Sequence, residues 1–115
     1  MQKVALFVFN GDPVCFIHVL LNALDMAEKG HEVKVVLEGA ATQQIAELAD
    51  ASKPFAQLYA KVKEKGLVDA VCRACASKMN ALEAAEAQGL PINADMSGHP
   101  PLAKYIEAGY QIIAL

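Results

Sequence analysis

The sequence lacks an apolar run of the length that a membrane span needs. A transmembrane helix takes roughly 18 consecutive apolar residues, whereas the apolar run 4–9 is closed by the polar residues Asn10 and Asp12. The order of charged, apolar and small-residue segments that marks a secretory signal peptide is also missing. We therefore expect a cytoplasmic protein that does not bind membranes.

An excess of basic residues is likewise absent. The chain has 10 Lys and Arg residues against 13 Asp and Glu residues, which gives a formal net charge of −3. Proteins that bind nucleic acid usually carry a basic patch, so we expect no nucleic-acid partner. Neither a Gly-x-Gly-x-x-Gly nor a Gly-Lys-Ser/Thr motif is present, and nucleotide binding is not expected either.

Cysteine is scarce, with three residues, and an odd number in a reducing compartment argues against a disulfide framework. Catalysis, redox chemistry, metal binding and core packing remain as roles. Cys72 and Cys75 can supply two zinc ligands, and Cys15 or His99 can complete the set. A second Cys-x-x-Cys motif or a pair of histidines is missing, however, so we expect no metal. We expect no organic cofactor either.

What the chain does contain is enough apolar sequence for one core. Its 115 residues are 55% hydrophobic and 20% charged, which favours a single domain over residues 1–115. Runs rich in Val and Ile alternate with segments of helical periodicity. The expected strands cover residues 3–9, 31–37, 67–72, 90–94 and 110–115, and the expected helices cover residues 13–29, 42–48, 54–65, 73–88 with a break near Asn80, and 101–108.

This alternation predicts a three-layer α/β/α fold with a five-stranded, mainly parallel sheet. We expect the strand order 2-1-3-4-5 of flavodoxin-like folds, with a site beyond the carboxyl ends of strands one and three. That order brings all three cysteines towards one edge of the sheet. Asn10, Gly11, Cys15 and His99 lie in or beside the loops at that edge, and we expect them to bind substrate.

The segment Leu67–Met79 holds two cysteines at a junction between a strand and a helix. The unpaired N–H groups at a helix start stabilise a thiolate and lower the pKa of a cysteine. The position predicts that Cys72 is a reactive sulfur and that Cys75 assists it. The alternatives are that both are small buried apolar side chains, or that they form a thiol–disulfide redox pair.

The chain resembles the DsrE/DsrF-like family of small cytoplasmic sulfur-relay proteins, which includes the TusC and TusD subunits of a tRNA thiolation relay. The resemblance covers nearly the whole chain. It is carried by the Val4–Phe9 run with Asn10-Gly11-Asp12 after it, by the Val71–Ala76 junction, and by the closing Pro101–Leu115 segment with Gly109-Tyr110-Gln111-Ile112-Ile113.

The resemblance implies that Cys72 carries sulfane sulfur as a persulfide, between a donor and an acceptor protein. It also implies a homotrimer or homohexamer, and we expect the Ala-rich segment 70–87 to pack against another subunit. The resemblance also implies that Cys75 is an addition found in a subset of the family, so its role stays open. The alternative function is a non-catalytic oligomeric binding module with structural cysteines.

Overall fold

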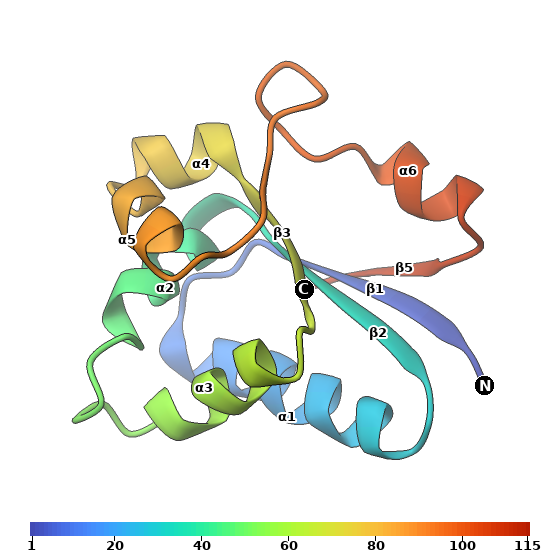
Figure 1. The fold of residues 1–115 in the computed structure, drawn as a ribbon, viewed down its shortest axis with the longest axis horizontal. Coiled ribbons are helices and arrows are strands. Elements are labelled where there is room, and N and C mark those ends of the chain that lie inside the picture. Colours follow the sequence, from blue (N-terminus) through green and yellow to red (C-terminus); the bar gives the residue numbers. More distant parts are fainter.

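Five strands alternate with helices in the computed structural model, which describes all 115 residues (Figure 1). The expected elements are confirmed, with the bounds shifted by a few residues. They are β1 (Lys3–Val8), α1 (Pro13–Glu28), β2 (Glu32–Leu37), the 3₁₀ helix η1 (Gly39–Thr42), α2 (Gln43–Glu47), α3 (Ala56–Glu64), β3 (Val68–Cys72), α4 (Arg73–Lys78), α5 (Leu82–Ala87), β4 (Ile92–Asn93), α6 (Leu102–Glu107) and β5 (Gln111–Ala114).

All five strands are parallel, and their order is β4-β3-β2-β1-β5. The α/β class and the five-stranded parallel sheet are thus confirmed. The expected order 2-1-3-4-5 places β1 between β2 and β3, whereas β1 here pairs with β2 and β5, and β3 pairs with β2 and β4. Strand β2 therefore separates the carboxyl ends of β1 and β3.

The strand order decides on which face of the sheet each connecting helix packs. The steps from β1 to β4 all run in one direction across the sheet, so right-handed crossovers put their helices on one face. The return from β4 to β5 runs the other way and puts α6 on the opposite face. Figure 1 shows α6 apart from α1 and α3, on the other side of the sheet.

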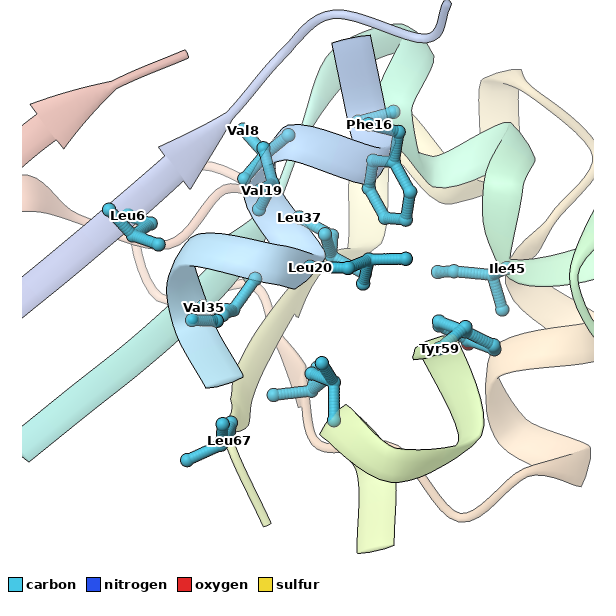
Figure 2. Packing of buried hydrophobic residues seen from close by; sticks show 14 of the residues in the cluster. Leu6, Val8, Phe16, Val19, Leu20, Val35, Leu37, Ile45, Tyr59 and Leu67 are labelled. Carbon is cyan, nitrogen blue, oxygen red and sulfur yellow. The ribbon is translucent and has the colours of Figure 1, made fainter. Parts of the chain in front are cut away.

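Residues of β1 alternate between two hydrophobic cores, because successive side chains of a strand point to opposite faces. Leu6 and Val8 belong to the larger core, where they pack with residues of α1 such as Phe16 (Figure 2). Ala5 and Phe7 belong to a smaller core on the side of α6. Both faces of the sheet are therefore buried, which explains the uninterrupted apolar run in the sequence. The smaller core contains Ala5, Phe7, Val36, Ala70, Tyr105 and Tyr110.

Asp12 and Pro13 form the start of α1. The Asp12 carboxylate accepts hydrogen bonds from the backbone N–H groups of Val14 and Cys15, at 2.8 and 3.4 Å, and Pro13 occupies the first helical position. The break expected near Asn80 is also confirmed, since that residue has φ +58° between α4 and α5. No helix is both long and apolar enough to cross a bilayer.

Several alanines of the segment 70–87 face the protein's own core. Ala76, Ala81 and Ala85 are almost fully buried and belong to the larger core. The exposed side chains of this segment include Arg73, Lys78, Glu83 and Glu86. These small side chains allow α4 and α5 to pack closely on the sheet. Contact of this segment with another subunit stays a prediction.

Candidate functional site

Four side chains that can bind a metal or a proton converge beyond the carboxyl ends of β2 and β3. They are Glu38, Cys72, Cys75 and His99, and their ligand atoms all lie within 4.8 Å of one another. Glu38 directly follows β2, and the two cysteines lie at the junction of β3 and α4. His99 comes from the loop between β4 and α6. We call these four residues the Cys72 cluster.

Cys72 is both the last residue of β3 and the N-cap of α4, with extended backbone angles (φ −66°, ψ 115°). Its Sγ atom accepts a hydrogen bond from the Cys75 backbone N–H at 3.5 Å and lies 3.0 Å from His99 Nδ1. The Gly98 carbonyl oxygen is 3.7 Å from the same sulfur. The Cys72 side chain is fully buried, whereas those of Cys75 and His99 are half-buried.

The loop that carries His99 is held against the first turn of α4. Ala74 N–H donates a 2.9 Å hydrogen bond to the Gly98 carbonyl, and Met96 and His99 pair through two backbone hydrogen bonds of 2.8 and 3.0 Å. Gly98 has φ +95°, and a Cβ atom there would lie 3.2 Å from Ala74 Cβ. These contacts fix the position of the imidazole relative to Cys72.

The charge environment of Cys72 differs from the expected one. Burial raises the pKa of its thiol to about 12, and the negative charges of Cys75 and Glu38 act in the same direction. The hydrogen bond from the Cys75 N–H lowers the pKa but does not offset the loss of solvent. The expectation of a lowered pKa is therefore wrong, because it counted the helix start and not the burial. Cys72 rests as a neutral thiol.

Glu38 is the member of the cluster that the sequence analysis missed. Its side chain is only 8% exposed, and burial raises its pKa against the opposing effects of His99 and of a hydrogen bond with Cys72. Glu38 takes part in none of the three ion pairs of the chain. The sequence marks Glu38 only in that it is a charged residue directly after the buried strand β2.

The other expected site residues lie beside β1, apart from the Cys72 cluster. Cys15 and Asn10 line a cavity of about 290 Å³ together with residues of α1 and Leu115. The backbone at Gly11 is held in place by a hydrogen bond, since its carbonyl oxygen accepts from the Gln44 side chain at 2.8 Å. The structure thus brings together Cys72, Cys75 and His99 but leaves Cys15 outside their cluster, because β2 lies between β1 and β3.

The cluster suits three kinds of sulfur chemistry. A thiol within hydrogen-bond distance of an imidazole is the arrangement of an activated nucleophile. Two nearby thiols can be oxidised to a disulfide. Two thiolates, an imidazole and a carboxylate are also ligand types that zinc uses. No organic cofactor is needed for any of these.

The chain is similar to proteins of archaea and bacteria. An uncharacterised protein of Methanocaldococcus jannaschii is 38% identical over 121 residues, which cover 99% of this chain and 96% of that protein. An uncharacterised protein of Archaeoglobus fulgidus is 42% identical over 41 residues, 36% of this chain and 67% of that protein.

A conserved protein of unknown function from Bacteroides thetaiotaomicron has the same fold. The two structures superpose with a TM-score of 0.64 and 16% sequence identity, over 96% of this chain and 94% of that one. The sequence profile of the DsrE/DsrF-like family matches residues 3–115, from the start of β1 to the last residue of the sequence, so the chain belongs to the DsrE/DsrF-like family.

Proposed function

We propose that the protein is a sulfur carrier that holds sulfane sulfur as a persulfide on Cys72. The family is generally associated with sulfur relay. The observation that supports the role for this chain is the 3.0 Å contact between Cys72 Sγ and His99 Nδ1. A neutral thiol needs a base to become a nucleophile, and His99 lies within reach of its proton.

In the loading step, the Cys72 proton passes to His99 Nδ1. The Cys72 thiolate then attacks the outer sulfur of the donor's persulfide, so that its electron pair forms a new S–S bond. The S–S bond of the donor breaks, and its electron pair leaves on the donor's thiolate, which takes the proton from His99. Sulfur exchange of this kind is balanced without an oxidant, a metal or an organic cofactor.

Unloading follows the same chemistry with the partners exchanged. A thiolate of the acceptor attacks the outer sulfur of the Cys72 persulfide, and Cys72 departs as the leaving group. Cys75 and His99 are half-buried and form the side of the cluster nearest to solvent. The proposal therefore needs a donor and an acceptor protein that dock over the loop of His99. The homotrimer or homohexamer and the cytoplasmic location stay predictions.

Mass spectrometry tests the loading step. We expect purified protein, incubated with cysteine persulfide and a metal chelator, to gain the mass of one sulfur atom on the peptide that contains Cys72. The Cys72→Ser variant should lose this adduct. Cys15→Ser is the matched control, because Cys15 is exposed and the proposal gives it no part. The lack of an adduct on Cys72 in the folded protein contradicts the proposal.

A second candidate function is a binding module with structural cysteines, which the complete burial of Cys72 favours. Thiol titration separates the two. Under the sulfur-carrier proposal, Cys72 reacts with a small disulfide reagent in the native protein. A Cys72 that reacts only after unfolding supports the structural role. A Cys72–Cys75 disulfide in air-oxidised protein indicates the redox alternative.

A further inference from the structure

The Cys72 cluster holds a buried acidic side chain beside two thiols and an imidazole, and sulfur transfer gives this carboxylate no task. Glu38 is 8% exposed, lies with its carboxylate among the other three groups, and has no cationic partner in an ion pair. A buried carboxylate that is not neutralised costs folding free energy. We propose that Glu38, Cys72, Cys75 and His99 together bind one Zn²⁺ ion.

The set of donors matches zinc in type and number. Zinc in proteins is usually bound by four ligands drawn from cysteine sulfur, histidine nitrogen and carboxylate oxygen. Calcium and magnesium prefer sets made of oxygen alone, which the two cysteines exclude. Cys72, Cys75 and His99 supply three ligands from one part of the sequence, and the fourth, Glu38, lies more than 30 residues before them.

The distances within the cluster fit a single ion. Tetrahedral zinc, with Zn–S of about 2.3 Å and Zn–N of about 2.0 Å, separates a sulfur from a nitrogen by about 3.5 Å. His99 Nδ1 lies 3.0 Å from Cys72 Sγ and 3.9 Å from Cys75 Sγ, values on either side of this separation. All other pairs of ligand atoms lie within 4.8 Å. Small side-chain movements therefore complete the site.

The backbone also prepares the site. Cys72 and Cys75 are spaced by one turn at the start of α4, and the hydrogen bond between Ala74 and Gly98 holds the loop of His99 in place. On binding, both thiols lose their protons to the solvent, and the imidazole coordinates through its neutral Nδ1. The three negative ligands and Zn²⁺ then carry one net negative charge, and the buried Glu38 carboxylate gains a cation in direct contact.

Zinc and sulfur compete for the same atom. The Cys72 electron pair that binds Zn²⁺ is the pair that attacks a persulfide, so the metal-bound site does not load sulfur. This consequence rests on the proposed function, whereas metal binding itself does not. The site thus has two exclusive states, a zinc-bound one and a sulfur-carrying one.

Cobalt substitution tests the metal site. We expect one equivalent of Co²⁺ to give the thiolate-to-cobalt charge-transfer absorption and the strong visible bands of a tetrahedral site, and Zn²⁺ to displace it. Cys75→Ser and Glu38→Gln should weaken Zn²⁺ binding by at least about tenfold, while Cys15→Ser should bind as the unmodified protein does. Equal affinity of all these proteins, or cobalt spectra without a charge-transfer band, overturns the proposal.

A measurement on the unmodified chain covers the case in which a variant does not fold. Zn²⁺ should protect Cys72 and Cys75 from an alkylating reagent and leave Cys15 reactive. Alkylation of all three cysteines at rates that Zn²⁺ does not change contradicts the site. Persulfide loading is measured separately in the presence of a chelator. Zinc binding without persulfide loading supports the metal site and contradicts the sulfur-carrier proposal. Persulfide loading without zinc binding supports the sulfur-carrier proposal and contradicts the metal site.

Discussion

Cys72 Sγ lies 3.0 Å from His99 Nδ1, although 27 residues separate the two in the sequence. The contact joins the end of β3 to the loop after β4. It places a candidate base beside a thiol whose pKa burial raises to about 12. Only the thiolate is nucleophilic, so a thiol in this state needs a base beside it to react, and His99 is placed to be that base.

Replacing His99 should therefore slow sulfur loading. We expect His99→Ala to reduce the rate at which Cys72 gains sulfur by about 100-fold, since general-base catalysis contributes at least that much. The rate is measured by mass spectrometry at a fixed concentration of persulfide, in the presence of a chelator. His18→Ala, on the exposed side of α1, is the matched control. An unchanged rate in a folded His99→Ala protein removes the histidine from the mechanism.

The free energy of unfolding should fall in acid because of Asp69. Burial by itself raises the pKa of this carboxyl, but the hydrogen bond from Tyr105 and the ion pair with Lys34 outweigh it and hold the pKa below its usual value. A lowered pKa stabilises the folded state above the unfolded pKa of about 4. This contribution is lost as the pH falls through the folded pKa.

Urea unfolding at several pH values between about 6 and 3 measures the effect of Asp69. The Asp69→Asn variant should be less stable than the unmodified protein at pH 6, and the difference should shrink as the pH falls. If the free energies of unfolding of the two proteins differ by the same amount at every pH in this range, Asp69 does not contribute to the loss of stability in acid.

Tyr105 links α6 to the sheet through the same carboxylate. Its hydroxyl donates a 2.6 Å hydrogen bond to Asp69, and its ring meets Phe7 edge to face at 5.3 Å between ring centroids. Tyr105→Phe keeps the ring and removes the hydroxyl, so we expect a loss of about 1–2 kcal/mol in the free energy of unfolding. Chemical denaturation measures this loss. A Tyr105→Phe protein with the same denaturation midpoint as the unmodified protein contradicts a stabilising role for the hydrogen bond.

Gly11 should not tolerate a side chain. Six of the seven glycines have positive φ, and Gly11 is the exception. A Cβ atom at Gly11 would lie 2.6 Å from the Ala40 carbonyl oxygen, which belongs to the backbone of η1. We expect Gly11→Ala to lower the free energy of unfolding by about 1–3 kcal/mol through crowding. A protein as stable as the original shows that η1 can move aside.

Most of the fold could be predicted from the sequence. Local signals such as the Asp12 cap and the Val-rich strands depend on near neighbours in the chain, and they predicted every strand and α-helix, whereas the 3₁₀ helix η1 was not expected. The strand order depends on which faces and edges pack in space. Nothing near β5 in the sequence indicates that it pairs with β1.

The candidate site was predicted in part, for the same reason. Cys72, Cys75 and His99 were chosen by residue type and loop position, and the structure brings them together. Glu38 follows the expected strand 31–37 but is not among the expected site residues. The effect of burial on the Cys72 pKa depends on the loop packed over α4, which the Cys-x-x-Cys spacing does not reveal.

The pairing of β1 with β5 also bears on how the chain is made. Residues 3–8 are synthesised before the other four strands, but one side of β1 finds its partner only when residues 111–114 have been synthesised. Until then a nascent chain exposes an unpaired strand edge, a feature that invites association with other chains. Completion of the sheet therefore depends on β5, the last of the five strands in sequence order, and β1 keeps one unpaired edge while the other strands form.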